Sequence, residues 1–294
     1  MDVQPIRDFK YYRTLWKDRA YHAFRRWQHQ RGLQQELASG LYERPIPAHD
    51  LKLSTCIISM NAADRIAPVI RHAKTFSDEV VIGVDSKTTD ETFQVAGQAG
   101  ADVVFWIEND SQTCNAGLEA LVKACSGDWI VRLDDDEYFE PSFLTIKDYL
   151  ITQNHYTHYK FPRLHLCQAS PLKWINDSYL YPDYQMRLFK NDLSLLHFPG
   201  AVGHTQITSE GPKGRIYGTN IVHLNLAMNN RQKREEKLAR YIQRHHGEWV
   251  HPINEYALLY EDFGYHIEPY RNSDSAFCDL LTSMAIQPVP LNII

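Results

Sequence analysis

The stretch WIVRLDDDE, residues 129–137, ends a short apolar run in four acidic residues. The run has the composition of a buried strand. Adjacent carboxylates repel one another unless positive charge lies among them, and at the carboxyl end of a buried strand a divalent cation is the expected source. In an extended segment, residues two apart point the same way, so Asp134 and Asp136 are expected to converge on one metal ion or metal-bound diphosphate, whereas Asp135 points away. An acidic helix N-terminus is the alternative interpretation.

The chain before this stretch alternates between strand-like and helix-like patterns. Strands are expected at 55–59, 79–84, 103–107 and 129–133, and helices at 66–76, 88–99 and 115–125. Thr88 and Glu91 fit a capping box at the start of the second helix. This alternation predicts an α/β fold with a parallel sheet covered on both faces. Because the crossovers are right-handed, the loops that follow the strands gather at the carboxyl edge of the sheet, where such sheets bind ligands. The polar residues expected at this edge are Asn61, Asp64, Asp85, Asp134 and Asp136.

Four motifs in this order resemble the family 2 glycosyltransferases: VDSKTTD (84–90), NAGL (115–118), GDWI (127–130) and LDDDE (133–137). The similarity is strongest to the branch that includes lipopolysaccharide-core glucosyltransferase-like enzymes, and it covers roughly residues 53–143. It implies the GT-A fold, in which a Rossmann-like nucleotide-binding half with a mixed, mainly parallel sheet joins an acceptor-side half. It also implies transfer of a sugar from a nucleotide-sugar, here expected to be a UDP-sugar, to a glycan or glycolipid acceptor.

The resemblance also assigns roles to residues. Asp85 would meet the nucleobase, Asn61 and Asp64 would line the nucleotide cleft, and Asp134 would approach the ribose or diphosphate. Asp136 would hold the metal, with Asn115 and Asp135 completing the nucleotide site. Mn²⁺ or Mg²⁺ would offset the charge of the leaving nucleoside diphosphate, and Mg²⁺ needs only one or two protein carboxylates beside phosphate and water.

Two positions depart from the family pattern. Cys114 stands before Asn115 where the family often has Arg, so a positive charge toward the phosphates is missing or supplied elsewhere. Lys87 replaces the Gly that usually follows the strand-end Asp-Ser. Its charge could replace part of what is lost, or it could be a solvated loop lysine.

An inverting enzyme needs a general base to deprotonate the acceptor hydroxyl. Asp183, in YPDYQMRLFK (181–190), is the first candidate, because this setting resembles the family's acidic segment before an Arg-Leu-Phe-Arg-like strand. A turn aspartate beside Pro182 is the alternative. Glu210 is the fallback base. Arg187 is expected to contact the diphosphate or pair with a carboxylate, and His223 is either a third metal ligand or a core histidine.

Composition is that of a globular enzyme with three segments: an N-terminal helical extension (1–50), the glycosyltransferase domain (51–226), and a C-terminal helix with an aromatic tail (227–294). The formal net charge of −5 gives no support for nucleic-acid binding. The 5 scattered cysteines suggest no disulfide framework, and no signal peptide or membrane-spanning run is seen, so a cytoplasmic setting is expected.

The N-terminal segment carries aromatic residues at helical spacing among many Arg and Lys: Phe9, Tyr12, Trp16 and Trp27. We expect this stripe to pack on the catalytic domain or on a second copy of the chain. The alternative is peripheral contact with the inner face of a membrane, where basic, aromatic helices bind anionic lipid. A charged amphipathic helix is expected at 229–246, with Leu238 facing inward.

Two other functions share parts of this pattern. A nucleotidyltransferase has the same α/β plan, but it would open with a Gly-rich phosphate loop after the first strand, where residues 61–65 contain no glycine. A non-catalytic glycan-binding relative would be expected to lose the Asp-x-Asp motif, which is intact here.

Overall fold

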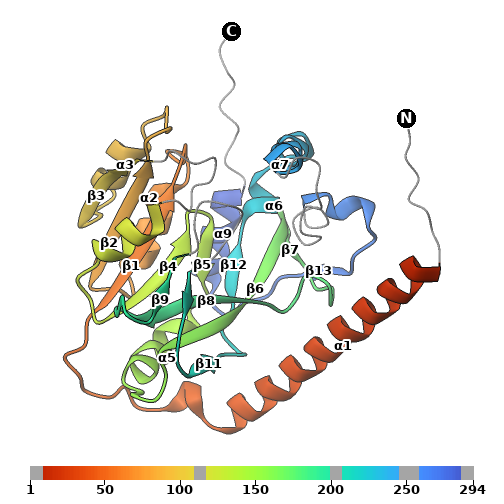
Figure 1. Ribbon diagram of the computed structural model, residues 1–294, viewed down its shortest axis with the longest axis horizontal. Helices are drawn as coiled ribbons and strands as arrows, with labels where there is room; N and C mark the ends of the chain where they lie inside the picture. Colours follow the sequence, from red (N-terminus) through yellow and green to blue (C-terminus); the bar gives the residue numbers. More distant parts are fainter. Residues whose placement is uncertain (1–8, 109–116, 199–206, 245–257, 286–294) are drawn as a thin grey trace.

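The computed structural model describes residues 9–108, 117–198, 207–244 and 258–285, with side chains described from residue 20 and, in the third range, up to residue 239 (Figure 1). One mixed sheet runs through the molecule in the order β13-β7-β6-β8-β4-β1-β2-β3. Its nucleotide-binding half is parallel and comprises β1 (Leu53–Ser59), β2 (Glu79–Asp85), β3 (Val103–Ile107) and β4 (Trp129–Asp134). The four predicted strands are therefore confirmed, together with their parallel pairing.

The second half of the sheet is mainly antiparallel. β8 (Asp183–Lys190) pairs with β4, and β6 (His158–Ala169) pairs with β8 and β7 (Leu172–Ile175). β12 (Ile221–His223) runs parallel to β6 and antiparallel to β5 (Glu137–Phe139). The remaining strands are short: β9 (Leu196–His197), β10 (Thr208–Ser209), β11 (Lys213–Arg215) and β13 (Ile267–Pro269).

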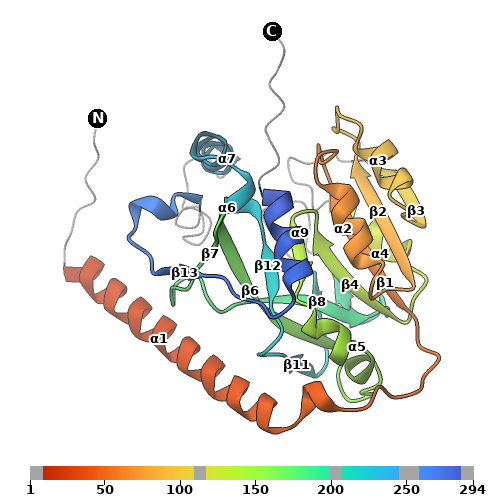
Figure 2. The same cartoon turned by 180° about the vertical axis from the view of Figure 1, so that it is seen from behind.

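Helices cover both faces of the sheet, as the alternation of elements predicted (Figures 1 and 2). Ile57 of β1 enters one core together with α2 (Ile66–Ala73), α3 (Thr92–Gln98), α5 (Ser142–Ile151) and α9 (Ser275–Ala285). Its neighbours Cys56 and Ile58 enter a second core with α4 (Leu118–Lys123). This alternation follows from the period of two in a strand.

The capping box predicted at Thr88 and Glu91 is wrong. The α3 helix begins at Thr92, and the Thr88 hydroxyl is buried without a hydrogen-bond partner. Asp90 caps this helix instead, because its Oδ1 accepts the Thr92 backbone N–H at 3.0 Å. An Asx turn of this kind satisfies one of the N–H groups that a helix start leaves free.

The α1 helix (Phe9–Ala38) lies along one side of the molecule, outside the sheet (Figures 1 and 2). It is followed by the short 3₁₀ helix η1 (Leu41–Glu43). Its inward face is polar: His29 contacts Tyr184 at 2.8 Å, and Glu36 accepts the backbone N–H groups of Tyr217 and Gly218. Trp27 is 51% exposed, so the prediction that it packs on the catalytic domain is wrong, and packing on a second copy stays a prediction. The side chains of Phe9, Tyr12 and Trp16 lie outside those that the structure describes.

The C-terminal segment packs on the catalytic domain. The predicted charged helix is α7 (Arg231–Arg244), which follows α6 (Asn225–Met228) and precedes the 3₁₀ helix η3 (Tyr260–Asp262). Leu238 faces inward as predicted, against a cluster that includes Cys167 and Leu258. Phe277 and Leu281 of α9 belong to the same core as β1, so residues beyond 227 complete the main hydrophobic core.

Candidate active site

The carboxyl end of β4 carries the three aspartates, but they do not lie in an extended segment. β4 ends at Asp134, and residues 135 and 136 form a turn into β5. The alternation of side chains along a strand therefore stops at Asp134, and Asp136 is not bound to share its face. Each aspartate is held by a different group, which relieves the repulsion between neighbouring carboxylates without requiring one shared cation.

Asp134 lies between two arginines. Its Oδ2 accepts a hydrogen bond from Arg187 at 2.9 Å, and its Oδ1 accepts one from Arg132 at 2.6 Å. Arg187 is 1% exposed and also binds both carboxylate oxygens of Glu137 at 2.8 Å. Of the two roles expected for Arg187, the structure shows carboxylate pairing. It also shows Asp134 bonded to arginines rather than grouped with His223, which argues against Asp134 as a metal ligand.

Asp135 is turned toward the end of β1. It accepts hydrogen bonds from the Ser59 hydroxyl at 2.8 Å and from Arg65 at 3.1 and 3.2 Å. Arg65 also contacts Asp64 at 3.0 Å, and Asp64 is 51% exposed. A charge-assisted pair of this kind fixes the loop after β1 against the turn after β4.

Asp136 meets His223 because β12 pairs with β5. Antiparallel register places His223 opposite Glu137, and its Nε2 lies 3.3 Å from Asp136 Oδ2. Asn225 donates a hydrogen bond to the same oxygen at 3.2 Å. Burial alone would raise the pKa of Asp136, but the charge of His223 and its hydrogen bond hold that pKa well below the ordinary value. Asp136 is therefore an ionised carboxylate beside the His223 ring.

This pair fits two ligands of one divalent cation. Neighbouring ligand atoms of an octahedral ion, each ~2.1 Å from the metal, lie ~3 Å apart, close to the 3.3 Å between Asp136 and His223. Within the part of the chain that the structure describes, no group of three or more His, Cys, Asp or Glu side chains could hold a metal. Phosphate and water would therefore supply the remaining ligands, as they commonly do for Mg²⁺.

His165, which the sequence did not single out, lies behind His223. The two Nδ1 atoms are 3.0 Å apart, and His165 Nε2 lies 3.9 Å from Asp183. Burial lowers the pKa of His165 to about 3, so its ring is neutral. Ligating histidines are commonly oriented by a partner on their other nitrogen, and His165 is in that position.

Asp183 therefore belongs to the same group of side chains as Asp136, His223 and His165, called the cluster below. It forms an ion pair with Arg163 at 2.7 Å and accepts a hydrogen bond from Gln185 at 2.7 Å. Burial would raise its pKa, but Arg163 holds that pKa below the ordinary value. Arg163 also reaches Glu137 at 3.0 Å, so the Asp183 and Asp134 sides of the cluster share one ionic network.

Glu210 lies elsewhere and cannot act as the base at this cluster. A chain of contacts links Glu210 to the amino end of β4. The Glu210 carbonyl accepts the Thr157 hydroxyl, and the Thr157 carbonyl accepts the backbone N–H of Lys190. Lys190 pairs with Trp129, the first residue of β4. The three aspartates follow the carboxyl end of the same strand. The Glu210 side chain is exposed and contacts His197 at 2.8 Å.

The expected nucleotide-side residues follow β1 and β2. Asn61 has a positive φ of 50°, and its side-chain oxygen accepts the Thr89 N–H at 2.8 Å. Asn is one of the few residues that adopts this conformation readily. Asp85 is 1% exposed, and its carboxylate accepts the Lys87 N–H at 2.8 Å. Asn115 and Cys114 lie outside the described residues.

Lys237 is a candidate site residue that the sequence pattern does not mark. It projects from α7, and its charge contributes to holding the pKa of Asp136 low. No hydrogen bond or ion pair to another described residue is seen for its ammonium group. It is therefore a candidate for the positive charge toward the phosphates that Cys114 does not provide.

Comparison with known proteins identifies the family. The model of glycosyl transferase family 2 matches residues 54–207, more than half of the 294 residues. The chain belongs to this family. The matched region begins in β1, contains the Asp134–Asp136 turn and extends past Asp183. His223, the partner of Asp136, follows the matched region in β12.

Individual relatives of this family 2 glycosyltransferase match over shorter stretches. An uncharacterized glycosyltransferase of Rickettsia felis is 36% identical over 110 residues, which are 37% of this chain and 37% of the relative. An uncharacterized glycosyltransferase of Rickettsia bellii is 40% identical over 88 residues, which are 29% of this chain and 28% of the relative. The alignments thus span just over a third, or less, of these relatives.

Among solved structures, a complex of Mycobacterium tuberculosis glucosyl-3-phosphoglycerate synthase with Mn²⁺, uridine diphosphate and phosphoglyceric acid is 15% identical, with a TM-score of 0.43. The match covers 76% of this chain and 88% of that one. Likeness at this level transfers neither a ligand nor a residue role. The sheet described above, a parallel βαβ half joined to a mixed half, is itself the GT-A arrangement that the family resemblance implied.

Proposed function

We propose that this protein transfers a sugar from a UDP-sugar to a hydroxyl group of a glycan or glycolipid, with inversion at the anomeric carbon and with Mn²⁺ or Mg²⁺ as cofactor. One observation carries the proposal: Asp136 and His223 stand 3.3 Å apart, at ligand spacing, at the carboxyl edge of the parallel strands. The neighbouring Asp134 and Asp135 are already neutralised by arginines.

In this proposal the donor lies across the carboxyl edge of β1, β2 and β4. Asp85 and Asn61 meet the nucleoside, and the partly exposed Asp134 accepts a ribose hydroxyl. Asp136 and His223 hold the cation, which offsets the negative charge that develops on the departing diphosphate. Lys237 contributes a further positive charge on the α7 side. His165 fixes the His223 ring through its Nδ1 contact.

Asp183 remains the proposed general base. It lies beside the cation pair through His165, and Arg163 keeps it ionised, which a proton acceptor requires. Its lowered pKa makes it a weak base, so we expect it to act late, when the acceptor hydroxyl is already acidified by bonding to the anomeric carbon.

The outward side of α1 supports a peripheral membrane contact. Tyr21, Phe24 and Trp27 are each more than half exposed, and Arg31 lies over the Trp27 ring at 5.6 Å. Aromatic and basic side chains together suit the interface of an anionic membrane. None of the described helices is long and apolar enough to cross a bilayer. We propose that the protein works in the cytoplasm beside the inner membrane face, where a glycolipid acceptor would be reached.

A thermal-shift screen tests the donor assignment. UDP-, GDP- and dTDP-sugars are added at equal concentration, each with Mn²⁺ or with EDTA. A ligand present at 100 times its Kd stabilises the folded state by ~2.7 kcal/mol. We expect the largest shift with a UDP-sugar and Mn²⁺. A larger shift with another nucleotide would reassign the donor, and no shift with any of them would contradict the proposal.

A further inference from the structure

A ribbon of two strands, β7 and β13, carries two neighbouring cavities on one face. The register pairs Trp174 with Glu268, and a backbone bond of 2.9 Å from Asn176 to His266 continues the ladder. Trp174 and Glu268 line a cavity of about 430 Å³, and Asn176 and His266 line one of about 390 Å³. Residues two apart share a face and lie ~7 Å apart along a strand, so the two cavities are neighbours on this face although they share no lining residue. The two cavities together are called the groove.

The groove is separate from the catalytic cluster. Leu164 of β6 lines the larger cavity. Its neighbours Arg163 and His165 point into the cluster with Asp183, and adjacent residues of a strand point to opposite faces. The groove and the Asp136–His223 pair therefore lie on opposite faces of β6.

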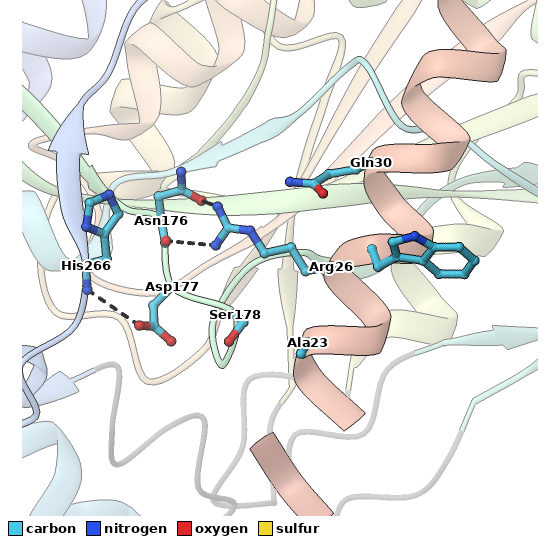
Figure 3. Close-up of a pocket in the computed structure, with 8 residues that line it drawn as sticks. Ala23, Arg26, Gln30, Asn176, Asp177, Ser178 and His266 are labelled. Carbon is cyan, nitrogen blue, oxygen red and sulfur yellow. Dashed lines mark hydrogen bonds between the residues drawn. The ribbon is translucent and has the colours of Figure 1, made fainter. Parts of the chain in front are cut away.

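The α1 helix forms one wall of the groove. Arg26 reaches from this helix to Asn176, bonding its backbone oxygen at 2.9 Å and its side-chain oxygen at 2.6 Å (Figure 3). Gln30, one turn further along the helix, lines the same cavity. At the other end, His29 of α1 bonds the Tyr181 hydroxyl at 3.1 Å, and the Tyr181 ring packs edge-on against Trp174.

Several polar groups that line the groove are unpaired. The Gln30 amide, the Ser178 hydroxyl, the Trp174 indole N–H and the Arg271 guanidinium make no hydrogen bond or ion pair with another described residue. They offer both donors and acceptors. The charged groups include both signs, with Arg271 and Arg26 against Glu268 and Asp177, so the groove does not select a strongly charged ligand.

Aromatic rings lie among these groups. Trp174 and Tyr181 are partly exposed, and the Tyr270 hydroxyl bonds the buried Glu140 at 2.8 Å. Glu140 also accepts the Asn220 side chain at 2.8 Å, which fixes this end of the cavity. Ring faces are electron-rich and attract weakly positive C–H groups, and pockets of a few hundred Å³ with a few placed polar groups are typical ligand sites.

We propose that the groove binds a neutral oligosaccharide, with C–H faces of the sugar rings on Trp174 and hydroxyl groups on Arg271, Glu268 and Gln30. A glycan held here would be a distal part of the acceptor, and its identity as acceptor rests on the proposed glycosyltransferase function. The binding of sugar in the groove does not depend on that function.

The test measures binding of maltose, lactose and cellobiose to the full-length protein by saturation-transfer-difference NMR and calorimetry. At least one of them should bind saturably at millimolar concentration. Trp174→Ala should weaken binding at least ~10-fold, and Arg271→Ala ~3–5-fold. Arg271 is exposed and without a partner among the described residues, so its replacement should leave the melting temperature unchanged and keeps the test valid if Trp174→Ala fails to fold.

Two controls separate the groove from other sites. Lys213→Ala, at an exposed position of β11, should leave sugar binding unchanged. Asp136→Asn should also leave it unchanged, even if it abolishes nucleotide binding, so failure of the proposed function and failure of the groove give different results. The inference is overturned if none of the three sugars binds, if binding survives both groove variants, or if Asp136→Asn removes it.

Discussion

At the scale of single residues, the three adjacent aspartates at the end of β4 have different partners. Asp134 and Asp135 are neutralised by arginines from β8 and from the loop after β1. Asp136 faces an imidazole and an amide instead. A carboxylate held by a fixed guanidinium has lost much of its attraction for a cation. Of the three aspartates, Asp136 is therefore the one that we propose as the metal ligand.

Asp135→Asn should destabilise the fold without removing metal-dependent nucleotide binding. The change takes the charge partner from Arg65 and is expected to cost ~1–3 kcal/mol of unfolding free energy. Asp64→Asn is the matched control, because Asp64 pairs with the same arginine from an exposed position and such pairs contribute ~0–1 kcal/mol. Denaturant melts of both variants check this. Equal stability losses, or loss of Mn²⁺-dependent UDP binding in Asp135→Asn, would contradict it.

Asp183→Asn should lower kcat by at least ~10²-fold and leave the Kd for UDP nearly unchanged, because a general base acts on the acceptor proton and not on the donor. Single-turnover kinetics, with a separate measurement of Mn²⁺ affinity, distinguish a general base from a residue that only positions the metal site. If the variant mainly weakens Mn²⁺ binding, Asp183 acts as a positioning residue for His223 through His165. Unchanged kcat would remove both roles.

At the scale of elements, α1 is attached to the catalytic domain by polar contacts and one close approach. Gly32 lies against Tyr217, where an added Cβ would come within 2.2 Å of the ring. His29 and Glu36 hold the helix on either side of this glycine. The sequence suggested an aromatic contact surface, but Tyr21, Phe24 and Trp27 are each more than half exposed. The helix is attached mainly through hydrogen bonds of Arg26, His29 and Glu36.

Gly32→Ala should lower the unfolding free energy by ~1–3 kcal/mol, because overpacking forces the Tyr217 ring or the helix to shift. Gly97→Ala is the control in an exposed position of α3, where nothing lies within 4 Å of the added Cβ. It should be neutral or stabilising by ~0.5–1 kcal/mol. Chemical denaturation measures both. A Gly32→Ala variant as stable as wild type would mean that α1 does not sit against Tyr217.

Acid should weaken the docking of α1. Burial, with the charges of Arg26 and Arg215, lowers the pKa of His29 to about 4, against 6.5 for the free side chain. Between these values the unfolded chain binds a proton that the folded chain does not, so stability is complete above pH 6.5 and falls as the pH approaches 4. The loss is at most ~1.4 kcal/mol per pH unit from this group.

The pH dependence of stability in His29→Gln checks this. Its unfolding free energy should fall less steeply than that of wild type between pH 6.5 and 4. Replacing the exposed Gln28 of α1 by Ala, which removes no titratable group, should leave the slope unchanged. Identical slopes in wild type and His29→Gln would show that His29 takes up its proton as easily in the folded protein as in the unfolded one.

At the scale of the whole molecule, local sequence patterns determined the parallel half of the sheet. β1, β2 and β4 were predictable because their residues are buried in near-continuous apolar runs, and β3 because its run is apolar although most of it is only half-buried. The edge that gathers Asn61, Asp85 and Asp134 follows from right-handed crossovers. We further propose 1–50 as an extension, 51–226 as the catalytic domain and 227–294 as a C-terminal segment whose α9 completes the catalytic core.

The rest of the site could not be predicted because its contacts join distant parts of the chain. His165 is an ordinary strand histidine until β12 brings His223 beside it, 58 residues later. The charge of Lys237 acts on Asp136 from α7, a helix that follows the matched family region. The turn at 135–136 shows no Gly or Pro, so nothing in the sequence marked where the extended geometry stops.

The most direct test of the account is calorimetric binding of UDP to wild type and to Asp136→Asn, each with Mn²⁺ and with EDTA. If Asp136 and His223 hold the cation that meets the diphosphate, wild type should bind UDP at least ~10-fold more tightly with Mn²⁺ than with EDTA, and Asp136→Asn should show little difference between the two conditions. Equal UDP affinity in Mn²⁺ and EDTA for wild type, or a full Mn²⁺ effect in Asp136→Asn, would contradict the account.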